Sequence, residues 1–236
     1  MRVPEPRRLG ALIFDFDHTL ADLGRWVDWR SARQEIERLF ARLGIDAAAL
    51  ARRRGDLTPM AALEAVLADH CSPAEAAAAR AEIHRILEGV ECAGAPATSL
   101  LVGAAETLAC ARRAGLALAI VSANAETAIH AVLERLGLAD DFGAVVGRGA
   151  GLPMKPAPDM YAEAARRIAT DPAAALAVGD SPSDVAGAVA AGIEAIGVLG
   201  GEGSEERLFG AGASWVLADL RALPPLLAFW ASHVSD

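Results

Sequence analysis

Short apolar segments alternate with longer segments of helical periodicity along most of the chain, and this alternation constrains the fold most. The apolar segments read LGALIFDFD, LALAIVS, FGAVVG, ALAVGD and EAIGVL, each bounded by Gly or polar turn residues as strands usually are. Ala-rich helical segments lie between them, at about 103–114, 125–136, 158–169 and 183–191. Strands that alternate with helices predict an α/β fold with a doubly wound parallel sheet and right-handed crossovers.

One long stretch interrupts this alternation. Residues 20–97 contain no convincing strand and are dominated by helical periods such as RSARQEIERLFARLG and SPAEAAAARAEIHRILEGV. We therefore expect an all-α domain that is inserted after the first strand. The expected boundaries are a Rossmann-like core of residues 1–19 and 98–236 and an inserted helical domain of residues 20–97.

The insert has a recognisable helix start and two recognisable linkers. Ser72 and Pro73, placed before Glu75, indicate where a helix begins. The passages that join the insert to the core, ADLGRWVDW and ECAGAPATS, contain the Gly and Pro expected of linkers. Trp26 and Trp29 in the first passage are expected to pack in the core of the insert, and stacking on a sugar or base is the alternative.

Composition and charge exclude several kinds of partner. The chain of 236 residues has a net charge of −9, whereas proteins that bind nucleic acids or anionic membranes usually present a basic face. It has no uncharged run of the roughly 20 residues that cross a membrane. Its three cysteines show no CxxC spacing, so neither a zinc site nor a disulfide framework is indicated. We expect small-molecule chemistry in the cytoplasm, without nucleic acid or membrane.

The apolar C-terminal stretch ALPPLLAFW, residues 222–230, is predicted to form a last helix of the core. A dimer contact is the alternative for this stretch. Both a monomer and a homodimer therefore remain open.

Polar residues stand at the ends of three predicted strands. Asp15, Ser122 and Asp180 each follow an apolar run, and open parallel sheets bind ligands beyond the carboxyl ends of their strands. The first run, IFDFDHTL, ends in two carboxylates, those of Asp15 and Asp17. Burying an unpaired carboxylate costs on the order of several kcal/mol. A cation, hydrogen-bond donors or water molecules are therefore expected beside Asp15 and Asp17.

Four short stretches, in order, carry a resemblance to a known family. They are DFDHT at 15–19, VSAN at 121–124, MKPAPDMY at 154–161 and VGDSPSD at 178–184. Together they resemble the four motifs of the haloacid dehalogenase-like hydrolase superfamily. The helical insert resembles the cap of the subgroup that includes phosphoglycolate phosphatases and β-phosphoglucomutases.

The resemblance implies phosphoryl transfer through an aspartyl-phosphate, and the residue types suit that reaction. The Asp15 carboxylate would attack phosphorus, and Asp17 would protonate the leaving oxygen and then activate water. Lys155 precedes Pro156 in a rigid turn and would form a phosphate clamp together with Ser122. A solvated surface lysine and a helix N-cap serine are the alternatives for these two residues.

A hard divalent cation fits the acidic motifs. Mg²⁺ prefers oxygen ligands and usually binds one or two protein carboxylates together with substrate phosphate. Asp15 and Asp180 would provide the two carboxylates. The family pattern implies that the backbone carbonyl of Asp17 is a further ligand. It also implies that Asp184 holds a metal-bound water or supports the site, and the alternative is an ordinary acid in the first turn of a helix.

Further contacts with substrate are expected around the first two motifs. The family commonly has Asn or another small residue directly after the Ser or Thr, but here Ala123 follows Ser122 and Asn124 comes next. The backbone donor is therefore kept, while the side-chain contact is not assured. Thr19 is expected to support the loop at the substrate site. His18 replaces the glycine usual in the family, either as a substrate contact or without a role.

Asp17 and the insert select among the reactions of the superfamily. An alkoxide leaving group needs a proton and a halide does not, so Asp17 favours phosphate esters over haloacids. Residues 20–97 contain no lysine, which disfavours the phosphonate-cleaving relatives that form a Schiff base with a cap lysine. The segment ARRRGD at 51–56 is the expected specificity loop, with Arg53 or Arg54 meeting an anionic group, and a solvated basic helix end is the alternative.

The sequence thus predicts a Mg²⁺-dependent phosphomonoesterase that acts on a small phosphorylated metabolite. Two alternatives remain open. In the first, the aspartyl-phosphate is passed to an alcohol, as in a phosphotransferase or mutase. In the second, the chain is a catalytically silent module that binds phosphorylated ligands or a protein partner.

Overall fold

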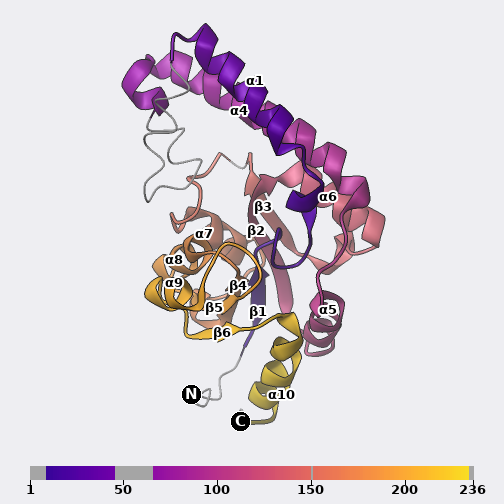
Figure 1. The fold of residues 1–236 in the computed structure, drawn as a ribbon. Helices are drawn as coiled ribbons and strands as arrows, with labels where there is room; N and C mark the ends of the chain where they lie inside the picture. Colours follow the sequence, from indigo (N-terminus) through magenta and orange to yellow (C-terminus); the bar gives the residue numbers. More distant parts are fainter. Residues whose placement is uncertain (1–8, 46–65, 150, 234–236) are drawn as a thin grey trace.

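A computed structural model describes residues 9–45, 66–149 and 151–233, which form a sheet with helices on both faces and a helical cap (Figure 1). The described strands pair in parallel in the order β3-β2-β1-β4-β5-β6. This order confirms the predicted doubly wound α/β fold. The strands are β1 (Ala11–Phe14), β2 (Ala117–Ala125), β3 (Ala144–Arg148), β4 (Ala175–Gly179), β5 (Glu194–Val198) and β6 (Trp215–Leu217).

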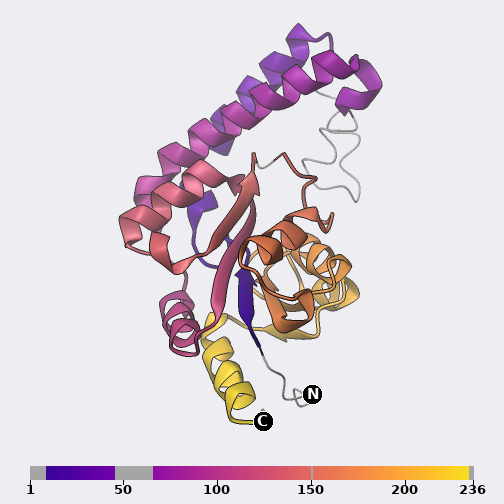
Figure 2. The same ribbon diagram turned by 180° about the vertical axis from the view of Figure 1, so that it is seen from behind.

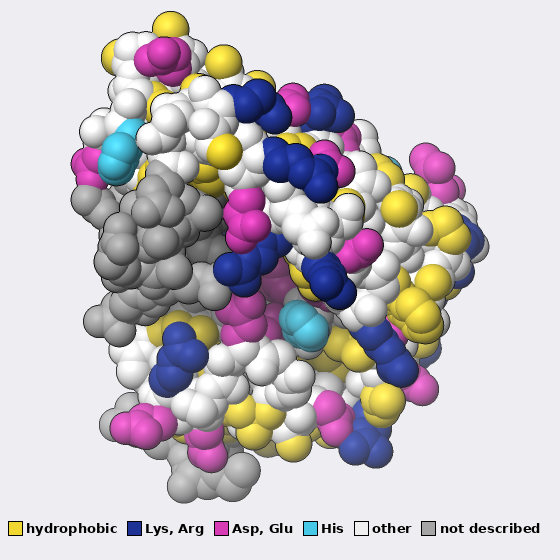
Figure 3. All heavy atoms as spheres, turned by 45° about the horizontal axis from the view of Figure 1, so that its top comes forward, with side chains coloured by type: hydrophobic (Ala, Val, Ile, Leu, Met, Phe, Trp, Pro, Cys, Tyr) yellow, Lys and Arg dark blue, Asp and Glu magenta, His cyan; other side chains and the backbone are white. Residues whose placement is uncertain are grey.

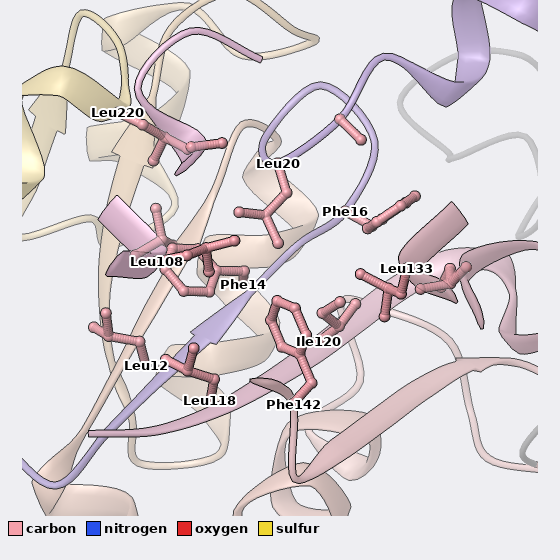
Figure 4. Packing of buried hydrophobic residues seen from close by; sticks show 14 of the residues in the cluster. Leu12, Phe14, Phe16, Leu20, Leu108, Leu118, Ile120, Leu133, Phe142 and Leu220 are labelled. Carbon is pink, nitrogen blue, oxygen red and sulfur yellow. The ribbon is translucent and has the colours of Figure 1, made fainter. Parts of the chain in front are cut away.

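The core forms because both faces of the sheet are apolar. Within β1, Leu12 and Phe14 belong to one buried cluster and Ala11 and Ile13 to the other, as the two-residue period of a strand requires. The first cluster contains the larger side chains, and Figure 4 shows them packed between β1, β2 and the adjoining helices. A continuous apolar run is therefore what this central strand needs.

Helices cover both faces of the sheet, and all of these except α9 (Glu205–Gly210) lie where the sequence predicts them. On one face lie α5 (Ala104–Arg113), α6 (Glu126–Leu136) and α10 (Leu223–His233), and on the other α7 (Asp159–Arg167), α8 (Pro182–Ala190) and α9 (Figure 1). Short 3-10 helices are η3 (Ala139–Asp141), η4 (Pro172–Ala174) and η5 (Leu220–Ala222). The sequence missed β6 and α9 because three and six residues are too short for a periodic signal.

The C-terminal helix α10 belongs to the core. Its Leu223, Leu227 and Trp230 are buried in the cluster that covers the face of Leu12 and Phe14. The structure therefore supports the predicted core helix at residues 222–230.

The insert between β1 and β2 is helical in its described part. Helices α1 (Trp29–Arg42) and α4 (Pro73–Gly94) lie side by side above the sheet (Figures 1 and 2), and residues 66–70 are also helical. They enclose a separate apolar cluster that includes Phe40, Ile83 and Leu87. Ser72 caps α4 through a capping box with Glu75, as the sequence predicts.

Two expectations about the linkers were wrong. The passage ECAGAPATS is not a linker from its start, because α4 continues through Gly94 and only then gives way to the 3-10 helix η2 (Ala95–Ala97). The first passage forms the 3-10 helix η1 (Leu23–Trp26), and Trp26 and Trp29 are 45% and 46% exposed instead of packed in the cap core. Trp29 Nε1 donates to the carbonyl of Gly24, and the Arg25 guanidinium lies 5.4 Å from the Trp26 ring centre.

Candidate active site

The predicted polar residues gather at one edge of the sheet, where the strand order reverses beside β1. Asp15 follows β1, Asp180 follows β4, and Ser122 lies near the end of β2. This edge faces the cap. Figure 3 shows it as a hollow with acidic side chains on its floor and a histidine and basic side chains around it.

Lys155 connects the first and last motifs. Its Nζ donates to Asp15 Oδ1 at 2.7 Å and to the carbonyl oxygen of Val121 at 3.2 Å, and it also contacts Asp184 Oδ1. Lys155, Asp15 and Asp184 are all buried. The solvated-lysine alternative is therefore wrong.

Three carboxylates lie close together around this ammonium group. One oxygen from each of Asp15, Asp180 and Asp184 lies within 4.8 Å of the others. Burial raises the pKa of Asp15 well above its usual range, which Lys155 opposes and the other two carboxylates reinforce. Burial followed by repulsion from Asp184 raises the pKa of Asp180 to about 6.

This cluster fits a divalent cation. Three buried carboxylates with one ammonium among them keep an excess of negative charge, and hard oxygen ligands are those that Mg²⁺ prefers. Burial alone would lower the pKa of Lys155, but the Asp15 and Asp184 carboxylates outweigh it and raise that pKa well above its usual value. The ammonium therefore stays charged beside the site.

Asp180 is held by groups on both sides. Its Oδ1 accepts from Thr19 Oγ1 at 3.3 Å, and its Oδ2 accepts from the amide of Glu202 at 2.8 Å. The loop that carries Glu202 approaches so closely that a Cβ on Gly201 would lie 1.8 Å from Asp180 Oδ2. Thr19 thus supports the acidic cluster, and Gly201 is needed for the approach of the loop.

Asp184 has two structural partners. It lies in the first turn of α8, where its Oδ2 accepts from the amide of Ser181 at 3.0 Å and from Ser181 Oγ at 2.7 Å. Its Oδ1 contacts Lys155. Asp184 is therefore an acid in the first turn of a helix, as the alternative role predicts, and it is also a member of the acidic cluster.

The Asp17 carboxylate points toward the linker between core and cap. Its Oδ1 accepts from the amide of Gly24 at 2.8 Å, and a Cβ on Gly24 would lie 2.3 Å from Oδ2. Burial raises the pKa of Asp17, while the hydrogen bond from Gly24 opposes the rise. The side chain of Asp17 lies outside the cluster of three carboxylates.

Ser122 and Asn124 form one hydrogen-bonded unit. Ser122 Oγ donates to Asn124 Oδ1 at 3.0 Å, and the amide of Asn124 donates back to Ser122 Oγ at 3.3 Å. The N-cap of α6 is Ala125, so the N-cap alternative for Ser122 is wrong. Ala123 is exposed between them.

His18 has a backbone conformation that explains the glycine usual in its place. Its φ of 62° lies in the left-handed region, which L side chains adopt at a cost. Its Nε2 lies 3.7 Å from Asp17 Oδ2, and its side chain is half-exposed. His18 thus lies beside the predicted acid.

The predicted specificity residues Arg53 and Arg54 lie outside the described residues. Conversely, several residues that shape the site had no motif to announce them. Gly24 and Glu202 act through the close approach of their backbones. Ser181 lies within the fourth motif but was not singled out, and it acts by capping α8. The Gly-Gly-Glu-Gly sequence after the fifth strand is a turn signal that could have indicated the loop of Glu202. Glu91 and Arg148 form a buried ion pair behind Ser122.

Comparison with known proteins assigns the family. The model of the haloacid dehalogenase-like hydrolases matches residues 9–192, across β1, the cap and the sheet through α8. The chain therefore belongs to the haloacid dehalogenase-like hydrolases, and it is an enzyme of that class with a helical cap.

Full-length relatives place it more narrowly within this family. The protein CbbY of Rhodobacter capsulatus is 32% identical over 226 residues, covering 91% of this chain and 95% of its own. A phosphoglycolate phosphatase of Rhodospirillum rubrum is 30% identical over 226 residues, covering 93% and 91%. The crystal structure of CbbY from Rhodobacter sphaeroides in complex with phosphate superposes with a TM-score of 0.65 at 26% identity, covering 91% of this chain and 96% of that one.

Among the described helices, none is both long and apolar enough to cross a membrane.

Proposed function

We propose that the enzyme is a Mg²⁺-dependent phosphomonoesterase that hydrolyses a small phosphorylated metabolite. The observation that carries this proposal is the buried group of Asp15, Asp180 and Asp184 around the Lys155 ammonium. A site that gathers this much negative charge is suited to a divalent cation, which in turn attracts a phosphate.

Asp15 is the proposed nucleophile. One of its carboxylate oxygens attacks phosphorus while the bond from phosphorus to the ester oxygen breaks, which leaves an aspartyl-phosphate. The Lys155 ammonium, 2.7 Å from Asp15 Oδ1, reduces the repulsion between this carboxylate and the incoming phosphate. Ser122 Oγ and the nearby amides are the proposed donors to a phosphoryl oxygen.

Asp17 is the proposed acid and base. In the first step its carboxyl group gives a proton to the leaving alkoxide, and a pKa raised by burial favours the protonated form that this step needs. In the second step the Asp17 carboxylate takes a proton from water as that water attacks phosphorus. The bond between Asp15 and phosphorus then breaks, and inorganic phosphate leaves.

The proposed ligands of Mg²⁺ are the carboxylates of Asp15 and Asp180, with the Asp17 backbone carbonyl and a contribution from Asp184. When bound, the cation supplies charge neutralisation and orientation of the phosphate. Thr19 and the Glu202 amide keep Asp180 turned toward this position.

The substrate class rests on the relatives. The solved CbbY of Rhodobacter sphaeroides has been crystallised with phosphate and, as a mutant, with xylulose-(1,5)bisphosphate. Several other relatives are phosphoglycolate phosphatases. We therefore propose a small anionic phosphate ester, of the phosphoglycolate or sugar phosphate type, as the substrate.

The test is phosphate release from a panel of phosphorylated metabolites with Mg²⁺ or with EDTA, for the wild type and for Asp15→Asn. The proposal requires metal-dependent release that the substitution abolishes. Consumption of substrate without phosphate release, with a phosphorylated alcohol as product, would establish a phosphotransferase or mutase instead. No turnover of any compound would favour the silent binding module.

A further inference from the structure

A buried ion pair joins the cap to the end of the sheet, behind the proposed phosphate site. Glu91 lies near the end of α4 in the cap and is 1% exposed, while Arg148 ends β3 and is 8% exposed. Arg148 Nη1 donates to Glu91 Oε1 at 3.1 Å and Nη2 to Oε2 at 2.7 Å. This paired geometry is the strong and directional form of an arginine–carboxylate contact.

The same two side chains hold the three residues that follow Ser122. Glu91 Oε2 accepts from the amide of Ala125 at 2.9 Å, and Glu91 Oε1 accepts from Asn124 Nδ2 at 3.2 Å. Arg148 Nη1 donates to the carbonyl oxygen of Ala123 at 2.6 Å. Residues 122–125, the end of β2 where its register with β3 shifts, are thus fixed from the cap side and from the sheet side at once.

Asn124 connects the Glu91 carboxylate to the hydroxyl of Ser122 through two hydrogen bonds. Because its Nδ2 donates to the Glu91 carboxylate, its Oδ1 faces Ser122 and accepts from Ser122 Oγ at 3.0 Å. The carboxylate therefore sets the orientation of the amide, and the amide holds the Ser122 oxygen in place. Because a hydroxyl has one proton, that proton turns away from Asn124 Oδ1 when Ser122 donates to a phosphoryl oxygen. Glu91 in the cap is two hydrogen bonds away from a proposed phosphate donor.

Stability alone does not account for such a pair. Taking two charges out of water is costly, and buried ion pairs replaced by apolar residues often leave a protein as stable or more so. What apolar residues cannot reproduce is the set of directional contacts to Ala123, Asn124 and Ala125.

We propose that Glu91 and Arg148 are positioning residues that hold residues 122–125, at the end of β2, in the conformation that binds the phosphoryl group. Because Glu91 belongs to α4, this conformation depends on how the cap is seated on the core. The expected loss of kcat/KM rests on the proposed phosphatase function. The expected loosening of residues 122–125 rests on the hydrogen bonds alone.

The kinetic experiment compares Glu91→Gln and Arg148→Lys with Glu82→Gln. Glu82 is a matched control because it lies on the same helix and forms an exposed ion pair with Arg85, at 2.7 Å. We expect Glu91→Gln to reduce kcat/KM by about 10- to 100-fold, because a misplacement of about an ångström can cost up to about 100-fold. The inhibition constant for inorganic phosphate should rise about tenfold, and Glu82→Gln should leave both unchanged.

A double variant separates positioning from stability. Glu91→Gln combined with Arg148→Gln leaves no buried charge unpaired. The double variant should therefore melt nearer to the wild type than the single variants Glu91→Gln and Arg148→Gln do. Its kcat/KM and phosphate inhibition should nevertheless stay impaired. Recovery of both to wild-type values in the folded double variant would overturn the proposal.

Amide hydrogen exchange gives a measure that does not require turnover. The peptide that contains Ala125 should exchange faster in Glu91→Leu than in the wild type or Glu82→Gln, because leucine offers the Ala125 amide no acceptor. Unchanged exchange would contradict the proposal even in an active enzyme. A wild type that releases no phosphate would instead count against the proposed function, and the exchange result would still decide whether the pair holds residues 122–125.

Discussion

At the scale of single residues, the approach of the Gly24 backbone to Asp17 decides where the proposed acid lies. We expect Gly24→Ala to reduce kcat/KM at least about tenfold, because its Cβ would lie 2.3 Å from Asp17 Oδ2 and displace the carboxylate. Gly89→Ala is the control, since no atom outside α4's own backbone lies within 4 Å of its Cβ. It should keep activity and add up to about 1 kcal/mol of stability to the helix. Equal activity of both variants would exclude the displacement.

His18 tests backbone strain separately from substrate contact. With φ at 62°, His18→Gly should raise the free energy of unfolding by about 1 kcal/mol, whereas His18→Ala should not. Thermal melts of the two variants check this. A loss of kcat/KM common to both would identify the imidazole as a substrate contact, and an equal melting temperature in both would contradict the strain.

At the scale of helices, two capping boxes provide a matched pair. Ser72 caps α4 in the cap and Ser181 caps α8, and each bonds the acid at the third position of its helix. Ser72→Ala and Ser181→Ala should each cost about 1 kcal/mol of stability. Only Ser181→Ala should also lower kcat, because Ser181 holds the Asp184 carboxylate that contacts Lys155. A normal kcat in Ser181→Ala would show that Asp184 needs no such support.

The elements differ in how far the sequence could predict them. Strand β1 was predictable because four consecutive apolar residues, Ala11–Phe14, are buried on both faces of a parallel sheet. Asp15, Asp180 and Lys155 followed from strand ends and motif order. The linker after α4 was expected to begin too early, at Glu91. Gly94 and Pro96 do mark the break, but residues 91–94 still belong to the helix, which packs against α6 and β2 in the folded chain.

The ion pair between Glu91 and Arg148 could not be predicted from the sequence. These residues are 57 positions apart and belong to different layers of the fold. Neither lies in a motif, and each alone has the character of a surface charge. Their pairing depends on the path of α4 across the end of β3, which no local pattern specifies.

At the scale of the whole molecule, a bound cation should stabilise the fold. At a Mg²⁺ concentration about 100 times its dissociation constant, mass action contributes about 2.7 kcal/mol. Melting temperature should therefore rise with Mg²⁺ in the wild type and fall back with EDTA, whereas Asp180→Asn should respond weakly. An equal response in Asp180→Asn would remove Asp180 from the proposed ligands.

The same stabilisation should depend on pH. Because burial raises the pKa of Asp180 to about 6, the metal-free folded protein binds its proton more tightly than the unfolded chain does. This group therefore costs the metal-free protein stability as pH rises from about 4 through 6. Mg²⁺ competes with that proton, so the rise in melting temperature should be larger at pH 7.5 than at pH 5. An equal rise at both values would contradict this coupling.

Helix α4 runs without interruption from Pro73 past Glu91, so a small change in its angle moves the far end of the cap over a larger distance. From Glu91 to Pro73 the helix rises about 27 Å, at about 1.5 Å per residue, without an interruption. A tilt of the helix by about 5° at the Glu91 end would move its Pro73 end by about 2 Å. A displacement too small to disturb the packing around Ser122 is thereby amplified at the Pro73 end of the cap, so the position of that end reports the angle at which α4 meets the core.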